Sequence, residues 1–177
     1  VKKFENYFFV SNEKIALSRE TEHNERKILE LSNPESFSLY VGIPFCPSRC
    51  SYCSFVMASI ERAEKLIEPY TKLLCEEIKR TAEIANKLGL RLETVYFGGG
   101  TPTTLSAEQL DTVLGTVNNS FDMSTCREFT VEAGRPDTID IAKLFALKEN
   151  KVDRISINPQ TVNDEVLKTI GRKHTAQ

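Results

Sequence analysis

The sequence lacks the features that would tie the chain to a membrane or to nucleic acid. No apolar run approaches the roughly 20 residues that a membrane-spanning helix needs, and no stretch resembles a secretory signal peptide. Its 23 lysine and arginine residues are balanced by 25 aspartate and glutamate residues, so no basic stripe favours a nucleic-acid partner. We therefore expect a protein of the reducing cytoplasm that has no membrane span and binds no nucleic acid.

Several common site patterns are missing as well. The glycine run at residues 98–100 is followed by Thr-Pro, without the Lys-Ser/Thr of a P-loop or the G-x-G-x-x-G of a dinucleotide-binding fold. A structural zinc site would need a second short pair of ligands, and no such pair follows residue 53. The five cysteines are an odd number, and three of them lie too close together for sensible disulfide pairing.

What the sequence does contain is a loop with three cysteines within eight residues. Cys46, Cys50 and Cys53 have C-x3-C-x2-C spacing and follow an apolar stretch, residues 39–43, that indicates a strand closed by Pro44. Iron–sulfur clusters take thiolate ligands, and three thiolates leave one iron of a four-iron cluster open to a small chelating ligand. The spacing therefore favours a reactive [4Fe–4S] site over a zinc site or a disulfide.

Downstream of the cysteine loop, expected helices alternate with short strands. A long helix has Pro69 near its start and Gly89 as its stop, with an apolar face at helical spacing. The capping residues Ser106, Asp137 and Asn163 predict three more helices. The helix after Asp137 is expected to direct three apolar side chains inward: Ile141, Leu144 and Phe145. Strands are expected ahead of these helices at residues 94–97, 127–131 and 154–157.

Four strand–helix units in succession predict an α/β fold with a parallel sheet, either a βα barrel or an open doubly wound sheet. The cysteine loop, the triple glycine, Glu132 and Gln160 each follow the C-terminal end of a strand. In parallel sheets these ends form one face, where ligands bind. We therefore expect four separate stretches to converge on one site, where a ligand with amine, hydroxyl and carboxylate groups would partner the polar side chains.

Residues 1–37 are expected to form an accessory β segment ahead of the βα domain at residues 38–177. The apolar groups at residues 7–10 and 14–17 flank Ser-Asn-Glu and predict a β-hairpin, and residues 26–31 predict a further strand. No chemistry is expected in this segment.

Five stretches carry a family resemblance, and Asn163-Asp-Glu165 and Ile170-Gly-Arg-Lys-His-Thr175 extend it, so that it covers about residues 38–175. They are Cys46-x3-Cys50-x2-Cys53, Tyr40-Val-Gly-Ile-Pro-Phe-Cys46, Phe97-Gly-Gly-Gly-Thr-Pro-Thr103, Thr130-Val-Glu-Ala133 and Arg154-Ile-Ser-Ile-x-x-Gln160. They resemble the radical S-adenosylmethionine superfamily, and within it the oxygen-independent coproporphyrinogen III oxidases (dehydrogenases) and their relatives. Gly42, Pro159 and the segment Glu132-Ala-Gly-Arg135 depart from the better-known members and indicate a divergent branch.

The resemblance implies a [4Fe–4S] cluster held by Cys46, Cys50 and Cys53, with S-adenosylmethionine chelated to the open iron. It implies cleavage of that cofactor to a 5′-deoxyadenosyl radical, with an electron donor. The radical would decarboxylate coproporphyrinogen III to protoporphyrinogen IX in haem biosynthesis. No catalytic residue is implied beyond the cluster and cofactor sites. Carried over by position, the expected cofactor-binding residues are Tyr40, Tyr52, Gly99, Gly100, Thr101, Glu132, Gln160 and Arg172.

Two other functions stay open at this point. Haem-binding chaperones share the barrel and the cluster loop, and the chain could also be an inert structural piece. The resemblance implies the N-terminal two-thirds of a (βα)6 barrel, so we expect the sequence to be a fragment of a longer chain. Its open barrel edges would then be covered by a neighbouring molecule or by the N-terminal segment.

Overall fold

The computed structural model describes residues 8, 10–55 and 58–177. The chain divides into two compact units, Val1–Ser36 and Phe37–Gln177.

The first unit contains a helix where the sequence predicted a hairpin. Helix α2 spans Asn12–Leu31, so the strands expected at residues 14–17 and 26–31 are wrong. Residues 7 and 9 of the remaining expected strand lie outside the described residues. Ser11, predicted as part of a turn, is the N-cap and accepts a hydrogen bond from the Lys14 backbone N–H at 3.4 Å. Many strong helix formers and the Glu22–Arg26 pair one turn apart favour this helix, whereas an isolated hairpin is marginal.

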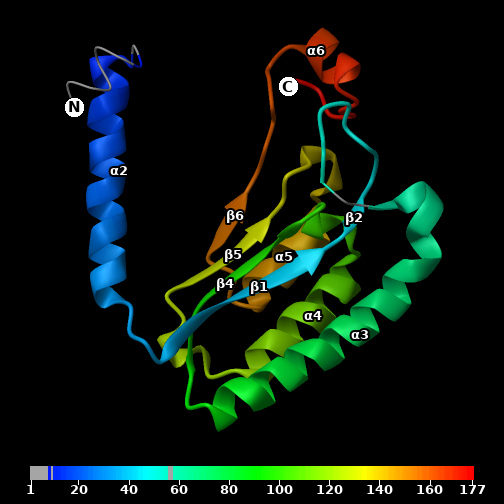
Figure 1. The fold of residues 1–177 in the computed structure, drawn as a ribbon. Coiled ribbons are helices and arrows are strands. Elements are labelled where there is room, and N and C mark those ends of the chain that lie inside the picture. The colour runs from blue at the N-terminus through cyan, green and yellow to red at the C-terminus, as the bar shows by residue number, and fades with distance from the viewer. Residues whose placement is uncertain (1–7, 9, 56–57) are drawn as a thin grey trace. The chain divides into compact units, whose positions relative to one another are not determined.

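The second unit is built on a four-stranded sheet with the order β1-β4-β5-β6. These strands span Ser36–Ile43, Arg91–Gly99, Glu128–Glu132 and Arg154–Ser156, and their arrows point the same way in Figure 1. In the parallel register Val95 lies opposite Phe129 and Val131 lies opposite Ile155. Two short strands, β2 (Phe45–Cys46) and β3 (Ala58–Ser59), form a second parallel pair. The predicted α/β fold with a parallel sheet is confirmed.

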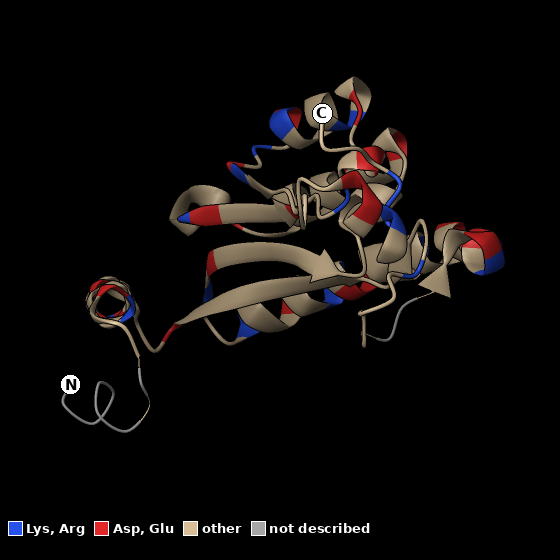
Figure 2. Ribbon diagram, turned by 90° about the horizontal axis from the view of Figure 1, so that it is seen from above, with Lys and Arg blue, Asp and Glu red and all other residues tan. Residues whose placement is uncertain are grey.

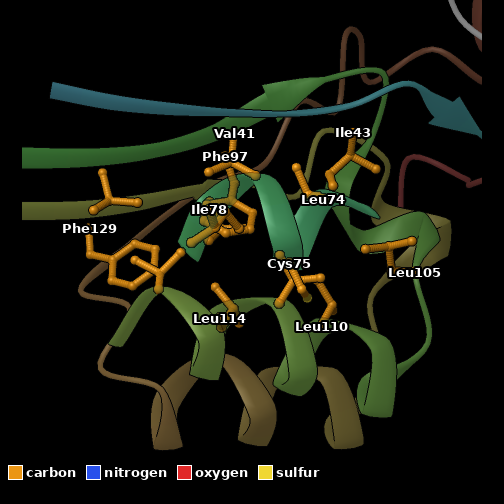
Figure 3. Close-up of a cluster of buried hydrophobic side chains, with 14 of the residues drawn as sticks. Val41, Ile43, Leu74, Cys75, Ile78, Phe97, Leu105, Leu110, Leu114 and Phe129 are labelled. Carbon is orange, nitrogen blue, oxygen red and sulfur yellow. The ribbon is translucent and has the colours of Figure 1, made fainter. Parts of the chain in front are cut away.

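Three helices follow the strands and cover one face of this sheet (Figure 3). They are α3 (Ile60–Lys87), α4 (Ala107–Ser120) and α5 (Ile141–Glu149), and a shorter helix, α6 (Asp164–Thr169), follows β6. Single 3₁₀ turns lie at Pro102–Thr104, Met123–Thr125 and Pro136–Thr138. Basic and acidic residues are interspersed along the second unit (Figure 2). No helix in the part of the chain that the structure describes is long and apolar enough to cross a membrane.

Two expected helix starts are wrong. Helix α3 begins at Ile60, so Pro69 lies inside the helix, where its missing N–H removes one hydrogen bond and the ribbon curves (Figure 1). Asp137 belongs to the 3₁₀ turn that begins at Pro136, and Asp140 caps α5 by accepting the Lys143 backbone N–H at 2.8 Å.

Several other terminal signals predicted from the sequence are confirmed. The capping box of Ser106 and Gln109 starts α4, and Asn163 caps α6. Gly89 ends α3 with a φ of +67°, and Gly171 follows α6 with a φ of +78°.

The hydrophobic core lies between the sheet and helices α3 and α4 (Figure 3). Strand residues such as Val41 and Phe97 meet Ile78 of α3 and Leu114 of α4, and each is nearly or fully buried. Burial of one such side chain contributes about 1.5–3 kcal/mol. Cys75 belongs to this core, as expected for a thiol that acts as a small apolar residue.

Helix α5 is rotated differently from the expected orientation. Ile141, Leu144 and Phe145 are exposed by 73%, 40% and 60%, and Leu147 is the buried residue of the helix. The physical reason is that α5 packs on α4 and that Asn150, the residue after the end of α5, binds α4. The side-chain amide of Asn150 donates to Asp111 Oδ1 at 2.7 Å and is buried between the helices.

Candidate cofactor site

One pocket gathers the expected site residues at the C-terminal ends of the strands. Its lining includes the three cysteines of the loop and the glycine run after β4. All expected site residues except Tyr40 line it: Cys46, Cys50, Tyr52, Cys53, Gly99, Gly100, Thr101, Glu132, Gln160 and Arg172. The predicted convergence of four separate stretches is therefore present in the structure. The roles of these residues as ligands and cofactor contacts stay predictions.

The three cysteines of the loop are free thiols in different surroundings. Cys46 lies in β2 and is buried, Cys50 is buried, and Cys53 is half-buried after a tight turn in which its N–H donates to the Cys50 carbonyl at 3.1 Å. Burial raises the pKa of the Cys46 thiol, while a 3.3 Å hydrogen bond with Thr101 Oγ1 and the charge of Arg135 oppose that rise. Binding to iron would favour the thiolate at all three positions.

The arrangement of the thiols differs from a site for one metal ion. Within the described residues, no group of three or more His, Cys, Asp or Glu side chains could hold a metal ion. In a four-iron cluster each thiolate binds a different iron, so the sulfurs stand further apart than around a single ion. Three free thiols line one pocket, and three thiolates are the donor set of a four-iron cluster with one open iron.

The glycine run places the end of β4 directly against the start of the cysteine loop. The Gly100 N–H donates to the Ile43 carbonyl at 2.7 Å, and the Thr101 N–H donates to the Phe45 carbonyl at 2.8 Å. Gly99 has a φ of +103°, and a Cβ on Gly100 would lie 2.5 Å from the Phe45 oxygen. The backbones can approach this closely only because these residues have no side chain.

Arg172 fastens the cysteine loop to the C-terminal part of the chain. It is 9% exposed, and its guanidinium donates to the Gly134 carbonyl at 2.7 Å and to the Tyr52 hydroxyl at 2.9 Å. The Ser51 N–H also donates to the Ile170 carbonyl at 3.2 Å. The expected site residues Tyr52 and Arg172 thus contact each other at one wall of the pocket.

Arg135 is a pocket residue that was noted in the sequence only as a departure from the family pattern. It is 2% exposed, and its Nη2 donates to the Ser48 carbonyl at 2.6 Å. Its Nη1, like Nε of Arg172, is buried without a hydrogen-bond partner among the described residues. Next to it, a Cβ on Gly134 would meet no atom within 4 Å. Unpaired buried donors and open space fit an acceptor-rich or anionic group in this pocket.

Tyr40 lies beside the pocket, on the sheet face opposite the helices. It is 62% exposed, and its ring stacks on Tyr96 with centroids 5.9 Å apart. Tyr96 donates to Glu132 Oε1 at 2.6 Å, and this bond, with partial burial, raises the pKa of Tyr96 to about 12. Tyr40 is therefore linked through Tyr96 to Glu132, which lines the pocket. Tyr96 itself was not expected from the sequence, because a tyrosine within a strand is ordinarily a packing residue.

Gln160 enters the pocket from the loop after β6. It is exposed and has a φ of +67°, which is uncommon for a residue with a side chain. Such conformations cost free energy and cluster at functional sites. This conformation is consistent with the expected contact between Gln160 and the cofactor, which stays a prediction.

Comparisons with known proteins agree with the site. The model of the radical SAM superfamily matches residues 40–177. The chain is 39% identical to the oxygen-independent coproporphyrinogen-III oxidase-like protein HemZ of Bacillus subtilis, over 96% of this chain and 34% of HemZ. It is 41% identical to the heme chaperone HemW of Lactococcus lactis, over 78% of this chain and 34% of HemW. The chain spans about a third of the length of the curated relatives it matches.

The fold is also similar to a solved structure. The coproporphyrinogen III oxidase HemN of Escherichia coli, a radical SAM enzyme, superposes with a TM-score of 0.67 and 28% identity. The alignment covers 77% of this chain and 31% of HemN. Because the family match covers most of the sequence, the chain belongs to the radical SAM superfamily, a family that implies a [4Fe–4S] cluster and S-adenosylmethionine.

Proposed function

We propose that the chain carries the cluster and cofactor site of an oxidoreductase that decarboxylates coproporphyrinogen III to protoporphyrinogen IX without oxygen. The observation that carries the proposal is the meeting of Cys46, Cys50 and Cys53 with the glycine run in one pocket. Relatives named for this activity, HemZ and HemN, support the choice of substrate.

The residues of this chain would bind, orient and shield the reacting groups. When bound, the cluster and S-adenosylmethionine supply the electron and the radical that remove hydrogen from a propionate. The three thiolates would hold the cluster, and Thr101 would keep its contact with the Cys46 sulfur. Gly99 and Gly100 leave backbone groups close to the pocket, where the cofactor can approach them.

Two further residues would act on the cofactor and on water. Glu132 lines the pocket and keeps acceptor capacity beyond the bond from Tyr96, which suits an ammonium or hydroxyl group. Arg172 ties Tyr52 to the opposite loop and so helps to exclude water from this wall.

A second candidate function is haem binding by a chaperone. The observation that favours it is the 41% identity to the heme chaperone HemW, which is as high as the identity to HemZ. A chaperone of this family would use the same pocket for the cluster without decarboxylating a porphyrinogen.

Anaerobic reconstitution with iron and sulfide, followed by dithionite and S-adenosylmethionine, distinguishes these functions. The enzyme is supported by 5′-deoxyadenosine that increases when coproporphyrinogen III is added, with release of carbon dioxide. Tight haem binding without decarboxylation supports the chaperone, and absence of both a cluster and cofactor cleavage supports an inert structural piece.

Matched serine variants test the site itself. Cys50→Ser is expected to abolish cluster absorbance and iron retention, because it removes one of three ligands. Cys126→Ser is the control, since Cys126 lies outside the pocket lining and donates to the Glu128 carbonyl at 3.5 Å. Equal iron retention in the two variants contradicts the proposed cluster site.

We also propose a cytoplasmic location, a dedicated low-potential electron donor, and an accessory role for residues 1–37. Strands β1 and β6 form the edges of the sheet, and Ile155 and Ile157 near the β6 edge are partly exposed. Unpaired edges favour association, so we propose that these edges are covered by a neighbouring molecule or by the N-terminal segment. Sedimentation of a well-behaved monomer at micromolar concentration contradicts that part of the proposal.

A further inference from the structure

Arg135 holds a buried positive charge next to the cysteine loop. It follows Gly134 in the segment after β5, and its Nη2 donates to the Ser48 carbonyl at 2.6 Å and to Ser48 Oγ at 3.2 Å. Ser48 lies between the first two cysteines of the loop. The guanidinium is therefore fixed to the loop that carries the thiols.

The guanidinium of Arg135 is buried at the pocket that the three thiols line. Arg135 is only 2% exposed, so solvent screens its charge weakly. A cation in a weakly screened pocket interacts strongly with negative charge nearby, and Ser48, which Arg135 binds, is two residues from Cys46 and two from Cys50. Among the residues that the structure describes, its Nη1 is buried and has no hydrogen-bond partner, and Arg135 lines the same pocket as the three cysteines.

The other charged side chains of the pocket discussed above, Glu132 and Arg172, already form hydrogen bonds. Glu132 accepts the hydrogen bond from Tyr96. Arg172 donates hydrogen bonds to the Gly134 carbonyl and the Tyr52 hydroxyl. Arg172 thus binds the cysteine loop through the Tyr52 side chain, whereas Arg135 binds the backbone of the loop at Ser48.

We propose that Arg135 raises the reduction potential of the cluster held by Cys46, Cys50 and Cys53. The inference rests on the proposed cluster site and adds a role for a residue outside the cofactor contacts. One-electron reduction adds one negative charge to the cluster without a proton, and a fixed cation beside the thiolates stabilises the reduced form. Through its charge, Arg135 would therefore make the cluster easier to reduce, without touching the reacting atoms.

The test compares two variants of the full chain, both of which lack the guanidinium of Arg135 and its forked N–H donors. Arg135→Gln removes the charge, and Arg135→Lys keeps it. Arg80→Gln is a matched control, because Arg80 lies exposed on α3 and pairs with Glu83 away from the pocket. The readout is an anaerobic redox titration of the reconstituted cluster with dithionite, followed by electron paramagnetic resonance of the reduced cluster.

We expect the midpoint potential of Arg135→Gln to be more negative than that of the unmodified chain. At a fixed applied potential the ratio of reduced to oxidised cluster should fall roughly tenfold. Arg135→Lys and Arg80→Gln should titrate close to the unmodified chain.

Three results overturn the inference. Identical potentials for Arg135→Gln and Arg135→Lys mean that the charge does not act on the cluster. Loss of the cluster from both variants means that Arg135 only holds the loop together. If the unmodified chain binds no cluster, the proposed site fails first and the role of Arg135 fails with it.

Discussion

Tyr96 and Glu132 form a hydrogen-bonded pair whose effect on stability depends on pH. The bond to Glu132 and partial burial raise the pKa of Tyr96 from its ordinary value of 10 to about 12. In the unfolded chain Tyr96 would lose its proton near pH 10, about two units lower. The stabilisation is therefore complete below about pH 10 and is lost as the pH rises towards 12.

We expect the Tyr96→Phe variant to lose less stability than the unmodified chain between about pH 10 and 12. Urea titrations at a series of pH values measure the free energy of unfolding for both proteins. Tyr70→Phe is a useful comparison, because burial and the charge of Glu77 also raise the pKa of Tyr70, but Tyr70 donates to the Gly42 carbonyl and not to a carboxylate. Identical pH dependence of Tyr96→Phe and the unmodified chain would rule out the Tyr96–Glu132 pair as the cause.

A second prediction at the residue scale concerns Gly100. A Cβ there would lie 2.5 Å from the Phe45 oxygen and 3.0 Å from the Ile43 oxygen, and both atoms belong to backbone that cannot easily move. We expect Gly100→Ala to lose about 1–3 kcal/mol in the free energy of unfolding and to bind iron less well. Gly134→Ala is the control, because its Cβ would meet nothing within 4 Å. Equal stability of these variants in urea would show that the close approach is not needed.

At the scale of elements, Asn150 joins α5 to α4. Its side-chain amide donates to Asp111 Oδ1 at 2.7 Å and to the Ala146 carbonyl at 2.9 Å. The backbone carbonyl of Asn150 accepts from Asn118 Nδ2 at 2.9 Å. We expect Asn150→Ala to lower the free energy of unfolding by about 1–3 kcal/mol, because Asp111 Oδ1 and the Ala146 carbonyl lose the buried side-chain donor, whereas the backbone bond from Asn118 remains.

Denaturation in urea compares this variant with Asn86→Ala. Asn86 is an exposed residue in the last turn of α3, and its replacement should change stability by less than about 0.5 kcal/mol. If the Asn150 variant is as stable as the Asn86 variant, the orientation of α5 has another cause.

At the scale of the whole βα unit, the pocket joins segments from both of its ends. Hydrogen bonds join the cysteine loop to the residue after α6, from Ser51 to Ile170, and to the segment after β5, from Arg135 to Ser48. A cluster bound at the three cysteines would stabilise all of these segments together, because ligand binding shifts local unfolding.

We expect cluster loading to slow amide hydrogen exchange at residues 46–53 and 170–172. Exchange within α4 should change little, because its apolar face is already buried in the core. Mass spectrometry of the reconstituted chain and the iron-free chain measures this difference. Protection confined to the cysteine loop would show that the segments do not act together.

The sequence predicted those elements whose local signals agree with their packing. The capping box at Ser106, the stop at Gly89 and the short strands were all readable, because turn chemistry and apolar patterns act over a few residues. The N-terminal helix was missed because the short apolar groups at residues 14–17 and 26–31 indicate strands, although the residues around them favour a helix. The start of α3 was missed because proline is tolerated inside a long packed helix.

By itself, the sequence determined the chemistry of the site, because the spacing of three cysteines and the glycine run are local properties. The tertiary structure decided which distant residues join them. Arg135 becomes a buried cation at the cysteine loop, and Tyr96 becomes the partner of Glu132, only when the parallel strands bring their ends together. Contacts between residues far apart in the chain depend on strand order and helix rotation, which local patterns do not encode.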